Sequence, residues 1–185
     1  KIRYNIYTTE VADFTTMADT LLAQLPKDES IFRLVFFGTP ANNEEYVTRR
    51  NILWNKIQQR YEDRLPVMSY VSQPALDGAL TLEVHSYRAD ENDHITYHPN
   101  KGFPYVTLEN ADGRFLFAGG FHSDILDFNI QQQAVEIFRL ASEVLHKENF
   151  PIENIIRQWN YIEQITSFDG AAQQTHHFHI SGRLL

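Results

Sequence analysis

The sequence predicts an α+β protein with an internal duplication. Strand-like and helix-like patterns alternate through the first half of the chain, separated by glycine, proline and asparagine turn signals. A helix, a short turn and a long strand then occur twice, at 13–37 and at 130–165. We infer a repeated structural unit from this recurrence.

The first three elements are defined by periodicity and breakers. Residues 1–9 (KIRYNIYTT) alternate apolar and polar side chains, which indicates a strand. Residues 13–25 place apolar side chains on one helical stripe, and Pro26 ends that helix. The stripe consists of Phe14, Met17, Ala18, Leu21, Leu22 and Leu25. The β-rich run at 31–37 (IFRLVFF) follows and ends at Gly38.

A second helix and two more strands complete the first unit. We expect Asn43 to cap the helix, with Glu44 and Glu45 in its first turn, where the helix dipole favours acidic groups. Its buried stripe is Tyr46, Leu53, Ile57 and Tyr61. Strands are expected at 66–73 and at 79–88, on either side of the Asp77-Gly78 turn.

The polar segment 89–102 is interpreted as a connection, which predicts domains at 1–90 and 103–185 joined by a linker at 91–102. In the second domain, YVTLEN and RFLFAGG flank Asp112-Gly113 and predict a hairpin. Asn129 and Gln132 predict a capping box for a helix ended by Asn149 and Pro151. The face of that helix carries Ala134, Ile137, Phe138, Ala141, Val144 and Leu145. The final predicted strand spans 154–165.

Composition excludes several classes of function. The chain of 185 residues has 16 Lys and Arg against 24 Asp and Glu, a net charge of −8, with no basic stripe for nucleic acid. No apolar run could span a membrane and no leader is visible, so we expect a cytoplasmic protein without a membrane partner. Without cysteine, disulfides and thiolate metal sites are excluded. No phosphate loop or hydrolase motif occurs, so we expect no cofactor.

The segment QQQAVEIFRLASEVLHKENFPIENIIRQWNYIEQI (131–165) resembles a helix and strand of the RidA/YjgF superfamily. That superfamily also carries the labels endoribonuclease L-PSP-like and translation initiation inhibitor, and the Trp-Asn-Tyr strand resembles its two-domain, chorismatase-like branch. Asn43-Glu44-Glu45-Tyr46 resembles the family's N-x-x-Y, and PVMSYVSQPALDGALTLEV (66–84) aligns without a gap to P-A-R-S-x-V-x-V-x-x-L-P-x-x-x-x-I-E-I. The resemblance implies a chorismate-mutase-like mixed β-sheet with two helices on one face, duplicated, and assembly into a trimer or another oligomer.

The resemblance assigns roles to residues of the first domain. It implies that Glu83 is the catalytic glutamate and that Asn43 is the cleft asparagine. Met68 stands where the family has the arginine that anchors the substrate carboxylate, and Tyr70 follows two residues later. His85 shares a strand face with Glu83 and Tyr87, which fits either an acid/base group or a polar outer face.

The second domain resembles the front half of the family domain only, and either truncation or a diverged tail accounts for the missing part. We name His122 as a ligand-binding candidate because it follows Gly119-Gly120 at a cleft loop of the family. Arg157 and Tyr161 are further ligand-binding candidates. Together with Trp159 they alternate on one strand face, and Ile156 and Ile162 are expected to face the helix. An interface role for these residues stays open. HHFH at 176–179 fits a metal site or a histidine-rich tail, and we expect no metal.

Two functions remain. The first is a non-catalytic or diverged member that binds a small anionic metabolite and assembles with itself. The second is a cofactor-independent enzyme, either an imine or enamine deaminase or a chorismate-processing hydrolase.

Overall fold

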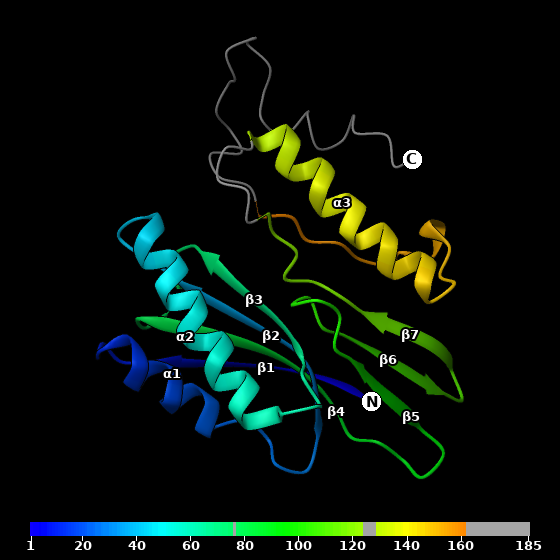
Figure 1. The fold of residues 1–185 in the computed structure, drawn as a ribbon. Helices are drawn as coiled ribbons and strands as arrows, with labels where there is room; N and C mark the ends of the chain where they lie inside the picture. The colour runs from blue at the N-terminus through cyan, green and yellow to red at the C-terminus, as the bar shows by residue number, and fades with distance from the viewer. Residues whose placement is uncertain (76, 124–128, 162–185) are drawn as a thin grey trace. The chain divides into compact units, whose positions relative to one another are not determined.

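The computed structural model describes residues 1–75, 77–123 and 129–161 (Figure 1). The chain forms two compact units, Lys1–Gly120 and Phe121–Leu185. The elements of the first unit are β1 (Ile2–Thr9), α1 (Phe14–Ala23), β2 (Ser30–Gly38), α2 (Asn43–Tyr61), β3 (Val67–Ser72), β4 (Leu80–Tyr87), β5 (His94–His98), β6 (Tyr105–Asn110) and β7 (Gly113–Phe117). The second unit contains α3 (Ile130–Lys147) and a short 3₁₀ turn, Ile152–Asn154.

The first unit contains one mixed sheet and one antiparallel sheet. The mixed sheet has the order β1-β4-β2-β3, in which β2 and β3 are parallel and are connected through α2. The other pairs, β1 with β4 and β2 with β4, are antiparallel. The second sheet, β5-β6-β7, is antiparallel throughout and includes the hairpin predicted at Asp112-Gly113. The predicted α+β class is therefore confirmed.

Helices α1 and α2 pack on the same face of the mixed sheet, as Figure 1 shows. Leu21 of α1 and Leu53 and Ile57 of α2 are completely buried against the sheet. From the sheet, Leu34 and Phe36 of β2 and Leu80, Leu82 and Val84 of β4 join the same core. Each buried aliphatic side chain stabilises the fold by about 1.5–3 kcal/mol, so this core dominates the stability of the unit.

A smaller core joins the two sheets of the first unit. Phe32 of β2 stacks on Tyr87 of β4 with ring centroids 5.6 Å apart, and Val106 and Leu108 of β6 pack beside them. This cluster explains why 91–102 is more than a connection. The segment 91–102 contains β5, which pairs with β6, and Tyr97 of β5 donates a hydrogen bond to the backbone oxygen of Ile31. The contacts end the first unit at Gly120, well beyond the predicted linker.

Two local expectations are wrong. The cap of α2 is Asn42, whose side chain accepts a hydrogen bond from Glu45 N at 2.9 Å, and Asn43 is the first helical residue. Residues 155–161 of the predicted last strand have no regular secondary structure. A strand needs a hydrogen-bonded neighbour, and residues 155–161 pair with none of the described strands. The rest of that segment, 162–165, lies outside the described residues.

In the second unit, the predicted capping box of α3 is confirmed. Asn129 accepts from Gln132 N at 2.9 Å, and the Gln132 side chain accepts from Asn129 N at 3.0 Å. Ala134 and Val144 of the predicted apolar face are buried. The expected packing of Ile156 on this helix is wrong, because Ile156 is 89% exposed.

Candidate functional site

A group of polar side chains lies on the face of the mixed sheet that the helices leave uncovered. Along β4, Leu82 and Val84 point toward the helices, so the alternating Glu83 and His85 point to the other face. In the neighbouring strands, Arg33 of β2 and Tyr4 of β1 both lie opposite His85. We call Arg33, Glu83, His85 and Tyr4 the Glu83 cluster.

Arg33 reaches this position through an irregularity in its strand. The β2–β4 register shifts between Ile31 and Arg33, so Phe32 has no partner in β4. Such a bulge changes which side chains face each side of a sheet. Phe32 joins the smaller core while Arg33 pairs with His85.

The distances within the cluster centre on one carboxylate oxygen. His85 Nε2 lies 2.6 Å from Glu83 Oε1, a hydrogen-bond distance, and Arg33 Nη1 lies 3.7 Å from the same oxygen. The Tyr4 ring packs edge-on against the His85 ring at 4.6 Å. His85 is 4% exposed and Arg33 8%, whereas the Glu83 side chain is 31% and Tyr4 61% exposed. The cluster therefore has an inner layer of histidine and arginine and an accessible carboxylate and phenol.

This arrangement has two chemical uses. A carboxylate hydrogen-bonded to an imidazole can transfer a proton, because either group can hold it. A guanidinium beside them can bind an anion. His85 lies on the polar face of β4, away from the helices, but its side chain is buried. Tyr87 does not join the cluster, because its hydroxyl donates to Asp93 at 2.7 Å and its ring stacks on Phe32.

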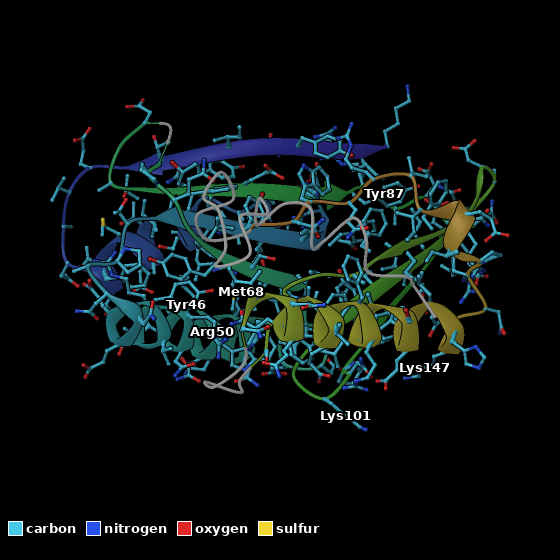
Figure 2. All side chains as sticks on the ribbon, turned by 90° about the horizontal axis from the view of Figure 1, so that it is seen from above. Tyr46, Arg50, Met68, Tyr87, Lys101 and Lys147 are labelled. Atoms are coloured by element: carbon cyan, nitrogen blue, oxygen red, sulfur yellow. The ribbon has the colours of Figure 1, made fainter. Side chains whose placement is uncertain are left out.

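Met68 lies on the other side of the sheet from Glu83. It pairs with Leu34 of β2 and packs against the helix-covered core. Tyr70, two residues along β3, lies on the same side and stacks on Tyr46 of α2 at 5.2 Å. Figure 2 labels Met68 and Tyr46. Burial is the main cause that raises the pKa of both tyrosine hydroxyls, which therefore act as neutral core groups.

Of the other predicted site residues, Asn43 is not brought into the cluster. Asn43 is an exposed residue in the first turn of α2, which packs on the opposite face of the sheet. His122, Arg157 and Tyr161 belong to the second unit. There the Arg157 guanidinium lies over the Trp159 ring, 5.2 Å from its centroid. Both Trp159 and Tyr161 are about half exposed, at 46% and 47%.

Sequence reasoning missed Arg33 and Tyr4. The signal for Arg33 was a single charged side chain within the apolar run IFRLVFF, which is unusual in a buried strand. Tyr4 lies in a strand of alternating pattern, and nothing local distinguishes it from Tyr7, which packs in the helix-covered core.

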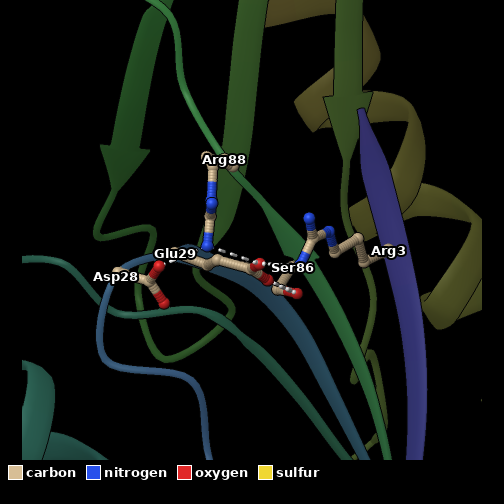
Figure 3. Close-up of polar contacts among 5 residues, drawn as sticks. All are labelled: Arg3, Asp28, Glu29, Ser86 and Arg88. Carbon is tan, nitrogen blue, oxygen red and sulfur yellow. Dashed lines mark hydrogen bonds and ion pairs between the residues drawn. The ribbon is translucent and has the colours of Figure 1, made fainter.

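A second charged group, shown in Figure 3, has a structural role. The Glu29 side chain is only 2% exposed; it accepts from Ser86 Oγ at 2.6 Å and pairs with Arg3 Nη1 at 2.7 Å. Arg88 pairs with Asp28 and approaches Glu29 at 3.9 Å. The Glu29 carboxylate is buried and is bound by Ser86 and Arg3. This group therefore stabilises the contact between the end of β4 and the loop before β2.

Across residues 1–75, 77–123 and 129–161, no set of three or more His, Cys, Asp or Glu side chains could hold a metal ion. In the same part of the chain, no helix is long and apolar enough to cross a membrane. The histidine run at 176–179 lies outside the described residues.

No family model, curated protein or solved structure matches this chain.

Proposed function

We propose that this chain is a RidA/YjgF-like protein of the chorismatase-like branch that binds a small anionic metabolite and assembles with itself without catalytic turnover. The parallel β2–α2–β3 connection and two helices on one sheet face support the family assignment. A mixed sheet with two helices on one face is what the sequence resemblance implies.

The position of Met68 carries the non-catalytic part of the proposal. The site of the expected anchoring arginine holds an apolar side chain, and that side chain packs toward the helices. The family's arrangement of an arginine at this position beside the catalytic glutamate is therefore absent from the first domain. Glu83 is instead paired with His85 and Arg33.

One observation favours a second candidate, a cofactor-independent acid/base enzyme. Glu83 and His85 are 2.6 Å apart, and the Glu83 side chain is accessible. Such a pair could move a proton on an imine, an enamine or chorismate.

Turnover assays separate the two candidates. We expect the purified protein to release no ammonia from imines derived from 2-aminoacrylate and to leave chorismate unchanged, because the substrate anchor is missing at Met68. Glu83→Gln serves as the matched control, since it removes the only carboxylate of the cluster while keeping its shape. Wild-type turnover that this variant abolishes would establish the enzyme and reject the non-catalytic proposal.

A further inference from the structure

We infer that the outer edge of β1 pairs with β1 of a second copy of the chain, antiparallel and about a two-fold axis at Asn5. The inference specifies the self-assembly that is part of the proposed function and rests on it. In the mixed sheet β1 pairs with β4 on one side, and none of the described strands pairs with its other side. Backbone N–H and C=O groups along that side of β1 therefore point away from the sheet, where another strand can bind them.

β1 differs from the other edge strands of the two described sheets. It is eight residues long, whereas β3 has six and β5 and β7 have five each. The segment after β7 runs against β3, because a Cβ atom on Gly120 would overlap the backbone oxygen of Met68. The exposed side chains of β5 and β7 are polar or charged, namely His94, Thr96 and Arg114. Among these described strands, β1 alone combines length with exposed apolar side chains.

β1 also lacks the features by which proteins keep an edge strand from pairing. Its sequence, IRYNIYTT, has no proline or glycine, and its register with β4 is regular throughout, without a bulge. Its one charged side chain, Arg3, is paired with Glu29 at 2.7 Å. Tyr4 and Ile6 lie on the face of the sheet that the helices leave uncovered and are 61% and 63% exposed. Pairing at this edge would therefore cover apolar surface.

The order of side chains along β1 makes the strand complementary to itself. Two antiparallel strands related by a two-fold axis pair residues that point to the same face. With Asn5 on the axis, Tyr4 lies opposite Ile6 of the second copy, and Ile6 lies opposite its Tyr4. An aromatic ring opposite a β-branched side chain is a favourable cross-strand pair. An axis at Ile6 would instead place Tyr4 opposite Thr8, so the axis at Asn5 is favoured.

The charges beside β1 favour the antiparallel direction. Lys1 precedes the strand and Glu10 follows it. In the antiparallel register each of these residues comes near the oppositely charged one of the second copy. Parallel pairing in register would bring two lysines together at one end and two glutamates at the other, and like charges oppose association. The partner that fits this edge is therefore another copy of the same strand.

Replacing the exposed apolar side chains tests the interface. Tyr4→Lys combined with Ile6→Lys introduces the residue that natural edge strands use against pairing, and places lysine opposite lysine. We expect an oligomeric wild type, and a variant whose mass by light scattering at equal concentration is lower by about half, because a two-fold contact is lost. Val47→Lys is the matched control. Val47 is 42% exposed in α2, outside β1, and its replacement should leave the mass unchanged.

A single introduced cysteine tests the register, because the chain has no cysteine of its own. Asn5→Cys places the cysteines of two copies directly opposite each other, with Cα atoms about 4.5 or 5.5 Å apart. Both separations lie within the range of a disulfide. We expect oxidation with diamide to convert most of this variant into a covalent dimer on a non-reducing gel. Thr96→Cys, exposed on the edge strand β5, is the control and should stay monomeric on the gel.

Circular dichroism verifies that each variant folds, and if the double-lysine variant does not fold, Ile6→Lys alone and the cross-linking decide. An oligomer whose mass the lysines leave unchanged would overturn the inference, as would Asn5→Cys that cross-links no more than Thr96→Cys. Either result leaves the proposed self-assembly intact through another surface. A wild type that is monomeric at every concentration would overturn the inference together with the self-assembly part of the proposed function.

Discussion

At the scale of single residues, two glutamates show how surroundings determine a role. Glu29 is buried to 2% exposure and is held by Ser86 and Arg3, so its carboxylate stabilises the fold. The Glu83 side chain is 31% exposed, although His85 and Arg33 beside it are buried, so solvent can reach its carboxylate. The difference follows from position, because Glu29 lies in a loop that packs against the sheet and Glu83 lies within a strand that alternates between faces.

The first residue-scale prediction concerns the hydroxyl of Ser86. Ser86→Ala removes a donor to the buried Glu29 carboxylate and should lower the free energy of unfolding by about 1–3 kcal/mol, because Arg3 pairs with the other carboxylate oxygen and the buried Oε2 loses its hydrogen bond from Ser86. Urea denaturation measures this change. Arg88→Gln is the control, since Arg88 is half exposed and its ion pairs contribute at most about 1 kcal/mol. Equal losses in the two variants would contradict the structural role of the buried carboxylate.

At the scale of elements, the face of the sheet to which a side chain points decides whether it can join a site or the core. Alternate side chains of a strand point to opposite faces of the sheet. In β3, Met68 and Tyr70 point to the face that the helices cover, whereas in β4, Glu83 and His85 point to the opposite face. Sequence alignment compares positions without specifying the face of the sheet. The residue expected to complete the Glu83 site is therefore a core residue in this protein.

Met68→Arg should accordingly destabilise the fold and create no activity. A guanidinium at this position would enter the helix-covered core, with an expected loss of about 1–3 kcal/mol from overpacking and desolvation. Thermal unfolding and the two turnover assays measure the outcome. Met68→Leu keeps volume and apolarity and should cost less than about 1.5 kcal/mol. If Met68→Arg is stable and gains turnover, the new side chain reaches Glu83, and the assignment of positions 68 and 83 to opposite faces of the sheet is wrong.

At the scale of the whole molecule, we expect assembly with other copies of the chain. Arg157, Trp159 and Tyr161 lie in a segment without regular structure, and the two aromatic rings are about half exposed. Aromatic and arginine side chains are enriched at protein interfaces. The proposed trimer or other oligomer would cover them.

Trp159→Ala should shift the mass measured by light scattering toward the monomer. A desolvated tryptophan at an interface typically contributes about 2 kcal/mol or more to association. When the variant and the wild type are compared in the same oligomeric state, their melting temperatures should differ little, because Trp159 is 46% exposed. Trp54→Ala, in α2, controls for loss of an indole and should leave the mass unchanged. A monodisperse wild-type monomer would refute the assembly proposal.

The sequence by itself determined the elements whose signals are local. Periodicity and turn residues placed β1 to β4, the hairpin of β6 and β7, and both long helices, and the Asn129 capping box follows from side chains three residues apart. Strand β5 was missed because its alternation lies within a polar segment, and the strand predicted at 154–165 was wrong over its described part because pairing depends on a distant partner.

Only the tertiary structure decided how residues from different strands meet. Glu83 and His85 could be placed on one face from the sequence, since alternation along a strand is local. Arg33 and Tyr4 join them through the β1-β4-β2 order and a bulge at Phe32, and Met68 is separated from them by the β2–β3 register. Strand order and register are set by packing between segments far apart in the chain, and this is why the composition of the candidate site required the folded structure.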